Sequence, residues 1–344
     1  MIRIRWLSKH CGYLLLLSTT PNRSYFANPI SFLPSKDIKV RGAGCLSVRA
    51  AMSASGKASS QAVERVVVVD NEEGQRGVEI LRSVNDEHGG VIVELVEPMD
   101  AAVYASSLRA SISHWRQQGK RGVWIKLPIE LANLVEATVQ QGFWYHHAEP
   151  KYLMLVYWIP EVDHTLPANA THRVGIGAFV MNEKREVLVV QENSGAFRGT
   201  GVWKFPTGVV EEGEDIFDAA VREVKEETGV DTEFVEVLAF RQSHQAFFQK
   251  SDLFFLCVLR PLSFDIQKQD SEIAAAEWMP IKEYAAQPFV QKHELTKYLI
   301  EICLAKNDGV YPGLSPVPTA TPMPSSSDKK KAYLYLCRSG LNRD

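Results

Sequence analysis

The stretch that most constrains this chain runs from Gly208 to Val230 and reads GVVEEGEDIFDAAVREVKEETGV. Within five positions it places three glutamates, Glu223, Glu226 and Glu227. At about 100° per residue, a helix gathers these side chains on one face. Like charges three and four residues apart repel, so a helix that only needed solubility would not concentrate them. A divalent cation would reverse the repulsion, because hard cations such as Mg²⁺ prefer oxygen ligands.

The same stretch carries an apolar stripe, centred roughly a third of a turn from the acids, that can dock the helix on a sheet. Asp215 is a suitable N-cap and Gly229 a suitable residue just past the helix end. The sequence therefore predicts a loop, a helix and a loop that form a metal-binding platform, with an acidic surface helix as the alternative. The stripe consists of Phe217, Ala220, Val221, Val224 and Thr228.

These residues resemble the Nudix box, G-x5-E-x7-R-E-U-x-E-E-x-G-U, in which U is aliphatic. The resemblance implies an α/β fold, the Nudix α/β/α sandwich. It also implies a hydrolase that splits nucleoside diphosphates linked to another moiety into two monophosphates. Every fixed position is filled at the right spacing, by Gly208, Glu214, Arg222, Glu223, Val224, Glu226, Glu227, Gly229 and Val230.

The resemblance also implies roles for four residues, which form the predicted catalytic set. Glu223 and Glu227 would bind Mg²⁺ or Mn²⁺, and Glu226 would be a third metal ligand or the base that positions water. Arg222 would orient the carboxylates through salt bridges, and Glu214 would support the loop or join the metal shell. Such metals neutralise a diphosphate and lower the pKa of bound water, so catalysis would rest mainly on positioning and electrostatics.

Composition limits the remaining choices. A length of 344 residues favours two domains, and the net charge of −3 gives no support for a surface that binds nucleic acid. No apolar run reaches about 18 residues, so no membrane-spanning helix is expected. The five cysteines are scattered and form no C-x-x-C pair, which argues against a zinc site and against a disulfide framework.

Residues 1–60 are expected to be a transit peptide followed by a flexible segment. Asp37 is the single acid among the first 52 residues, which are rich in basic residues and serine. This composition is typical of a chloroplast or mitochondrial transit peptide, and Cys45–Ser53 resembles a plastid processing site. The alternatives are a secretory signal around Leu14–Leu17 and a plain disordered extension, which would leave the protein cytoplasmic.

The chain then divides into a predicted α+β domain at 61–160, a linker at 161–171, the Nudix domain at 172–306 and a disordered tail at 307–344. Within the tail, a docked strand at Ala332–Leu336 is the alternative. In the first domain, Val66–Val69, Val78–Val84 and Val91–Val96 are predicted strands. Residues 101–118 and 129–141 are predicted helices. Residues 122–127 and 151–159 are further predicted strands.

Residues 143–147 and 151–160 resemble a plant-type subfamily of ADP-ribose and NADH diphosphatases. It is related to the vertebrate Nudix protein encoded antisense to a fibroblast growth factor. The resemblance implies that the first domain is a reduced acetyltransferase-like fold that serves dimerisation or substrate gating. An acyltransferase is a rival, although the acetyl-CoA phosphate loop is not evident. His146 and His147 are candidates for catalysis or metal binding, with a structural pair as the alternative.

The subfamily resemblance favours ADP-ribose or NADH as substrate. Coenzyme A, another nucleotide diphosphate and a non-catalytic nucleotide sensor are the alternatives. Arg241 and His244 are predicted to bind the diphosphate or the adenine, or else to make a structural contact at a strand end. Phe247 and Phe248 are expected in the core, with base stacking as the alternative. The predicted partners are a small-molecule nucleotide and a second copy bound through the first domain, with neither nucleic acid nor membrane.

Overall fold

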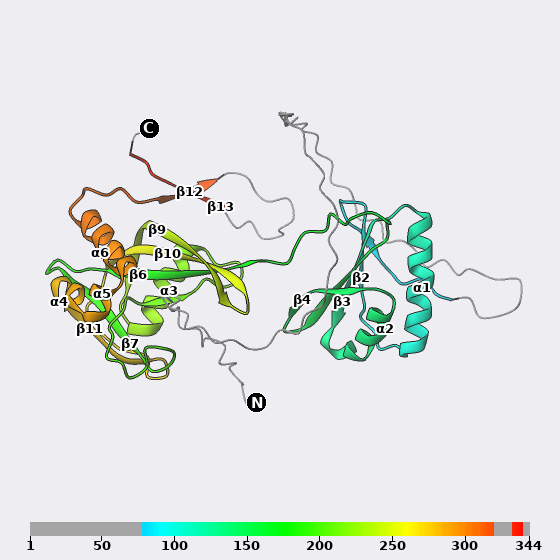
Figure 1. Cartoon of the computed structure of the whole chain (residues 1–344), viewed down its shortest axis with the longest axis horizontal. Helices are drawn as coiled ribbons and strands as arrows, with labels where there is room; N and C mark the ends of the chain where they lie inside the picture. The colour runs from blue at the N-terminus through cyan, green and yellow to red at the C-terminus, as the bar shows by residue number, and fades with distance from the viewer. Residues whose placement is uncertain (1–77, 320–331, 340–344) are drawn as a thin grey trace, which may run out of the picture. The chain divides into compact units, whose positions relative to one another are not determined.

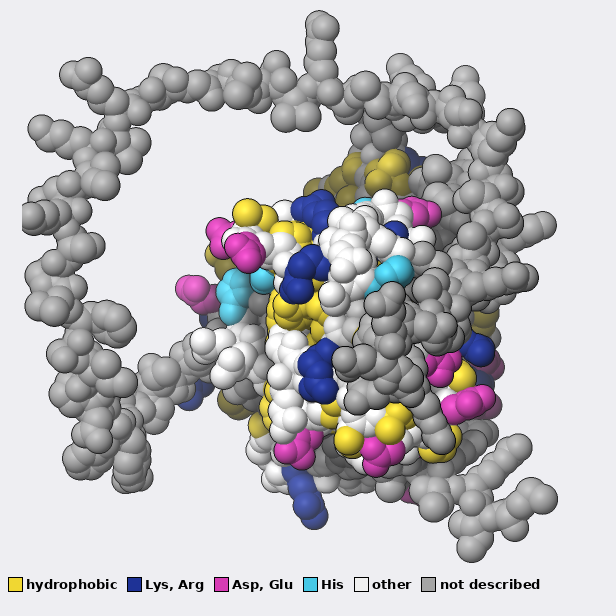
Figure 2. Space-filling view, turned by 90° about the vertical axis from the view of Figure 1, so that its right-hand side faces the viewer, with side chains coloured by type: hydrophobic (Ala, Val, Ile, Leu, Met, Phe, Trp, Pro, Cys, Tyr) yellow, Lys and Arg dark blue, Asp and Glu magenta, His cyan; other side chains and the backbone are white. Residues whose placement is uncertain are grey.

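A computed structural model of the chain describes residues 78–319 and 332–339 (Figure 1). These residues belong to two compact units, divided in the sequence between Asn169 and Ala170. The predicted transit peptide at 1–60 and the predicted strand at Val66–Val69 lie outside the described residues. No helix within the described ranges is long and apolar enough to span a membrane. Figure 2 shows that basic, acidic and histidine side chains all reach the surface on the face that it presents.

The first unit, up to residue 169, is a five-stranded mixed sheet in the order β1-β2-β3-β5-β4. The pair β2 and β3 is parallel and the other pairs are antiparallel. Figure 1 shows helix α1 alongside this sheet. The elements are β1 (Val84–Asn85), β2 (Val91–Glu94), α1 (Ala101–Gln117), β3 (Gly122–Pro128), a 3-10 helix (Ile129–Leu134), α2 (Val135–Gln140), β4 (Trp144–Glu149) and β5 (Tyr152–Trp158).

One core holds the first unit together. The carboxylate of Asp100 caps α1 by accepting hydrogen bonds from two backbone N–H groups of its first turn. Tyr104, Leu108 and Trp115 of α1 then pack with the apolar residues of β2, β3 and β5. This is the α+β arrangement that the sequence predicts. Most of the expected strand at Val78–Val84 is irregular, and β4 was not predicted because its residues are largely exposed and do not alternate in polarity.

The second unit, from residue 170, contains a four-stranded sheet in the order β8-β6-β10-β9 and a two-stranded sheet of β11 and β7. Strand β10 runs parallel to β6 and antiparallel to β9. The elements are β6 (His172–Val180), β7 (Glu186–Glu192), β8 (Thr207–Val209), α3 (Ile216–Thr228), β9 (Thr232–Phe247), β10 (Lys250–Pro261), β11 (Ile273–Pro280), α4 (Ile281–Ala286), α5 (Pro288–Lys292) and α6 (Glu294–Asn307).

Both faces of these sheets are buried, and alternation along the strands decides which residue faces which helix layer. Ala178 and Val180 pack with α3, whereas Phe179 between them packs with α4, α5 and α6. Likewise, Leu256 packs with α4, α5 and α6, and Cys257 packs with α3. Successive side chains of a strand point to opposite faces, so a continuous apolar run fills two cores. The predicted α/β/α sandwich is therefore confirmed.

The tail departs from the prediction of disorder. Residues Ser315–Thr319 (β12) and Ala332–Leu336 (β13) form an antiparallel pair, and the backbone of Leu314 exchanges two hydrogen bonds with Val237. The ring of Tyr333 meets that of Phe217 in α3 at 4.9 Å. The proline-rich composition predicted disorder, which was wrong for Ser315–Thr319. At Ala332–Leu336, where the sequence left a docked strand open, the structure has a strand whose Tyr335 packs against the core that α3 shares.

The tip of the β9–β10 hairpin holds a second difference. Phe248 is 85% exposed and lies in the turn between the strands, so the expectation that it packs in the core was wrong. The guanidinium of Arg173 lies 4.4 Å from the ring centre of Phe247, and this ring is also exposed. Helices α4 and α5 were not predicted, because five or six residues carry too few turns of a 3.6-residue period.

Candidate active site

Helix α3 presents two of its glutamates inward. Asp215 has the extended backbone of an N-cap, and Gly229 ends the helix with a left-handed φ of 74°. Glu223 and Glu227, one helical turn apart, are both buried together with Val224 and Thr228. The apolar and acidic faces thus overlap more than the sequence suggests. The two carboxylates lie between the helix and the segment around β8.

Arg222 connects the acids of the predicted catalytic set. Its Nε and Nη2 donate to the two carboxylate oxygens of Glu214 at 2.6 and 2.7 Å, and Nη2 also donates to the carbonyl of Val209 at 2.9 Å. Its Nη1 donates to Glu223 at 2.6 Å and to Glu226 at 3.3 Å. The bidentate bond to Glu214 raises the pKa of Arg222. Three carboxylates and the entry loop are therefore held by one planar cation.

Gly208, the first residue of the box, leaves the space that the carboxylate of Glu223 occupies. A Cβ at position 208 would lie 1.9 Å from Cδ of Glu223, which is far inside contact distance. The backbone of β8 and this carboxylate therefore touch directly. Glycine is needed here because of the close approach, since its φ is not positive.

Glu227 is a buried acid whose ionised form is electrostatically disfavoured. The pKa of Glu227 is raised to about 8, chiefly by burial and in addition by the charges of Glu223 and Glu192. The ammonium of Lys204 and the backbone of Thr207 act in the opposite direction. Within the described residues, Oε2 of Glu227 is buried and has no hydrogen-bond partner. A buried carboxylate oxygen without a partner is costly, and a hard cation would satisfy it.

The three predicted metal ligands differ in their burial. Across the described ranges, no three His, Cys, Asp or Glu side chains are already grouped as metal ligands. The side chain of Glu226 is 40% exposed and reaches toward Arg222, whereas Glu223 and Glu227 are buried side by side. Carboxylate oxygens are the donors that Mg²⁺ and Mn²⁺ prefer, and the orphaned oxygen of Glu227 fits such an ion. The metal roles of the three glutamates stay predictions.

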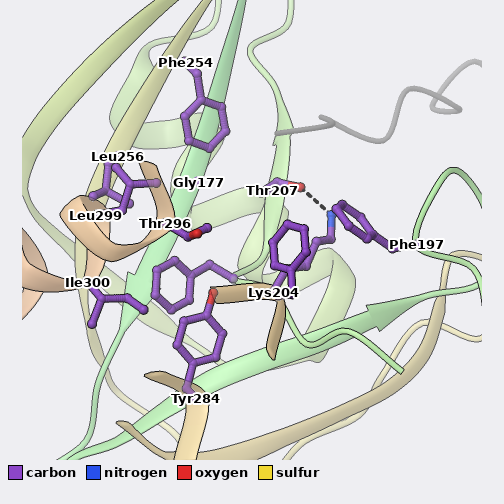
Figure 3. A pocket seen from close by; sticks show the side chains of 12 residues that line it. Gly177, Phe197, Lys204, Thr207, Phe254, Leu256, Tyr284, Thr296, Leu299 and Ile300 are labelled. Carbon is purple, nitrogen blue, oxygen red and sulfur yellow. Dashed lines mark hydrogen bonds between the residues drawn. The ribbon is translucent and has the colours of Figure 1, made fainter. Parts of the chain in front are cut away.

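An apolar pocket lies beside the carboxylates, and Figure 3 shows its lining. Its lining includes Lys204, Thr207 and the rings of Phe197, Phe205, Phe254, Tyr284 and Phe289. The Phe254 ring lies over Gly177, where a Cβ would come within 2.4 Å of it. Sequence reasoning missed this pocket, since its rings come from four separate segments. The alternation of β10, which puts Phe254 and Leu256 on one face, was the available signal.

Lys204 was also missed. Its side chain is only 11% exposed, forms an ion pair with Glu192 of β7 and donates a 2.8 Å hydrogen bond to Thr207 Oγ1. It lies just before the box, at a position for which no role was predicted. A lysine beside Phe205 and Pro206 in an otherwise apolar segment was a usable signal of a paired, buried cation.

Arg241 and His244 lie apart from the box acids in their contacts. Arg241 pairs across the sheet with Phe254 and interacts with the buried carboxylate of Asp252. His244 Nδ1 lies 2.9 Å from the hydroxyl of Ser251. Directly opposite residues of neighbouring strands point to the same face, so Arg241 shares the face on which Phe254 lines the pocket. The nucleotide-binding role predicted for both residues stays a prediction.

In the first unit, His146 and His147 make contacts of their own. Their Nδ1 atoms lie 2.7 Å apart, so one ring donates and the other accepts. Nε2 of His146 lies 2.9 Å from the carbonyl of Pro167, and the ring packs edge-on against Trp124. These contacts fit the structural alternative.

Comparisons with known proteins agree with this geometry. The family model described as the NUDIX domain matches residues 171–298, and one described as the Nudix hydrolase domain matches residues 81–159. Nudix hydrolase 2 of Arabidopsis thaliana is 62% identical over 243 residues, 71% of this chain and 87% of that protein. Nudix hydrolase 7 of the same plant is 56% identical over 260 residues, covering 75% and 90%.

A human protein, nucleoside diphosphate-linked moiety X motif 6, is 38% identical over 208 residues, 58% of this chain and 65% of its own length. Together these similarities define the class of the protein, which is an enzyme of the hydrolase type whose relatives generally use divalent metal ions. The chain belongs to the Nudix hydrolase family. Both family matches and the two structural units divide the sequence in the same region.

Proposed function

We propose that this Nudix hydrolase cleaves the diphosphate bond of nucleoside diphosphate derivatives, with ADP-ribose and NADH as substrates and Mg²⁺ or Mn²⁺ as cofactor. The observation that carries the proposal is the buried pair Glu223 and Glu227, with an orphaned oxygen on Glu227. The name of the human relative supports the substrate class, and the subfamily resemblance supports the two substrates.

In this proposal Glu223 and Glu227 hold the cation. When bound, the metal neutralises the diphosphate and supplies a water of lowered pKa. Arg222 keeps Glu223 in place through its 2.6 Å bond and is itself fixed by Glu214. Glu226 is the member of the set with most access to solvent, which is where the attacking water must enter. We therefore assign Glu226 the role of positioning that water.

The test is a turnover assay of ADP-ribose, NADH and coenzyme A with Mg²⁺ or Mn²⁺, comparing the wild type with Glu227→Gln. The variant is expected to lose about a hundredfold or more in kcat, since removing one preorganised electrostatic group typically costs that much. It should keep its thermal stability, because a neutral amide replaces a carboxylate that burial disfavours. Glu301→Gln, an exposed acid on α6, is the matched control and should behave as wild type.

Calorimetric titration with Mn²⁺ separates the metal assignment from the choice of substrate. The wild type should bind the ion, and Glu227→Gln should bind it more weakly. Near-normal turnover by Glu227→Gln would contradict the metal assignment. Metal binding without turnover of any of the three compounds would instead favour the nucleotide-sensor alternative.

A further inference from the structure

Lys204 is the charged side chain among the residues that line the apolar pocket. Figure 3 shows its ammonium reaching Thr207, and Phe197 lines the same pocket. The ammonium also acts electrostatically on Glu227. Lys204 therefore lies at the boundary between the acidic cluster and the aromatic pocket, and it touches both.

The ammonium is held in a fixed place. Glu192 pairs with it from β7, and Thr207 Oγ1 accepts a 2.8 Å hydrogen bond from the start of β8. A lysine ammonium has three N–H donors, and these two partners account for two of them within the described residues. The third donor is available to a ligand at the boundary between the acids and the pocket.

A phosphate needs such a group at this place. A diphosphate that approaches Glu192, Glu223 and Glu227 meets three carboxylates, which repel it. A metal on the glutamates offsets part of this repulsion. A fixed ammonium at the pocket boundary offsets the rest for the phosphate that lies nearest the pocket, and lysine binds phosphate as a point charge.

The pocket determines what is attached to that phosphate. Phe205 and Tyr284 stack on each other at 4.7 Å and are buried, whereas Phe197 and Phe289 meet edge to face at 5.1 Å and suit contact with another flat ring. Apart from Lys204, the lining side chains carry no charge. The pocket thus offers no counter-charge to a second phosphate on the ring-bearing half of a substrate.

We propose that Lys204 is a specificity-determining residue that contacts the phosphate joined to the ring-bearing half of the substrate, while the aromatic pocket takes the ring. This rests on the proposed diphosphatase function and names the part of the substrate that the chain recognises. A purely structural ion pair between Lys204 and Glu192 is the competing account.

The test compares the binding of AMP and of adenosine by calorimetry in the presence of Mg²⁺, so it does not depend on turnover. Lys204→Met is expected to weaken AMP binding at least tenfold and to leave adenosine binding within about twofold. The KM for ADP-ribose should rise in parallel. Lys204→Arg should recover part of the AMP affinity, because it keeps the charge.

Two further variants separate recognition from structure. In Lys204→Met/Glu192→Gln the unpaired carboxylate is removed too, so this protein keeps its charge balance and should fold. It is expected to bind AMP as weakly as Lys204→Met does. Lys306→Met breaks a comparable, partly buried ion pair with Glu236 far along the chain and should leave both affinities unchanged.

The outcomes are distinct. Recovery of AMP affinity in the double variant, or an equal loss for adenosine and AMP in Lys204→Met, would overturn the proposal in favour of the structural ion pair. If the wild type bound AMP in the expected pattern but hydrolysed none of the tested diphosphates, the proposed function would fail while the assignment of Lys204 stood.

Discussion

At the scale of single residues, the site depends on contacts that leave no spare room. The guanidinium of Arg222 bonds to three carboxylates and a carbonyl oxygen. Gly208 allows Glu223 to lie directly on the backbone of β8. The motif spacing identifies both residues. What the spacing does not reveal is the contact between Gly208 and Glu223, because the two residues meet only when α3 docks on β8.

Gly208→Ala is expected to reduce turnover by about a hundredfold with little change in the affinity of AMP. The added methyl would displace the Glu223 carboxylate, and misplacing one catalytic group by about 1 Å costs on that order. Steady-state kinetics measures the effect. Gly177→Ala is the matched comparison, since its methyl meets the ring of Phe254 in the pocket. That variant should change AMP affinity and KM more than kcat, and an equal kcat loss in both would contradict the prediction.

At the scale of elements, the end of α3 and the start of the tail are each fixed by close contacts with a segment distant in the sequence. Gly229 ends α3 in the left-handed region, and its Cβ position lies 2.8 to 3.1 Å from atoms of Gln267. The glycine was predicted from the sequence as the helix end. Its neighbour was not predictable, because the loop that carries Gln267 follows two long strands whose register no local pattern determines.

Gly229→Ala is expected to destabilise the protein more than Gly309→Ala. Both glycines have a φ of 74°, and a side chain in this region costs roughly 1–2 kcal/mol. Position 309 is otherwise open, whereas position 229 also meets the backbone of Gln267. Urea unfolding of the two variants measures the difference, which isolates the packing cost from the backbone cost. Equal losses of unfolding free energy in the two variants would show that the loop at Gln267 moves to accommodate the methyl group without cost.

Glu236 of β9 links three elements. Its carboxylate pairs with Lys306 of α6 and accepts hydrogen bonds from the backbone N–H of Gly313 at 3.0 Å and from Ser315 at 3.2 Å. Burial acts to raise the pKa of Glu236, but the bond and charge of Lys306, with the hydrogen bonds from Ser315 and Gly313, outweigh it and lower the pKa.

The pH dependence follows from that direction. A carboxyl group whose folded pKa is lowered stabilises the protein above its unfolded pKa, and this stability is lost as the pH falls through the folded pKa. Glu236→Gln should therefore lower the unfolding free energy by about 1–2 kcal/mol at pH 7. The gap should close in acid. Chemical unfolding at pH 7 and at pH 3 or below measures it, with the exposed acid Glu233 changed to Gln as control. A gap that stays constant with pH would contradict the assignment.

At the scale of the whole molecule, the chain consists of two units, each with a core of its own. The sites argued above lie within the second unit. Dimerisation through the first unit and its acetyltransferase-like ancestry stay predictions. The edge-packed and hydrogen-bonded histidines of that unit are explained by the contacts of Trp124 and Pro167.

We propose that residues 1–60 direct the protein to the chloroplast, with the mitochondrion as the alternative organelle. The proposal rests on the basic, acid-poor composition of the first 52 residues. Residues 1–60 fused to a fluorescent protein should accumulate in chloroplasts of plant cells, whereas the chain from residue 61 onward should not. Diffuse cytoplasmic fluorescence of the first fusion would contradict the prediction and favour the plain extension.

The sequence by itself determined the α/β class, helix α3 with both of its ends, and the identity of the acids and the arginine in the box. These features depend on neighbours within about twenty residues, so periodicity and spacing reveal them. Only the tertiary structure decided that Glu227 carries an orphaned oxygen, that Lys204 joins the acids to an aromatic pocket, and that part of the proline-rich tail forms strands. Burial and electrostatics act through space, between segments whose distance is known only after the sheets and helices have packed.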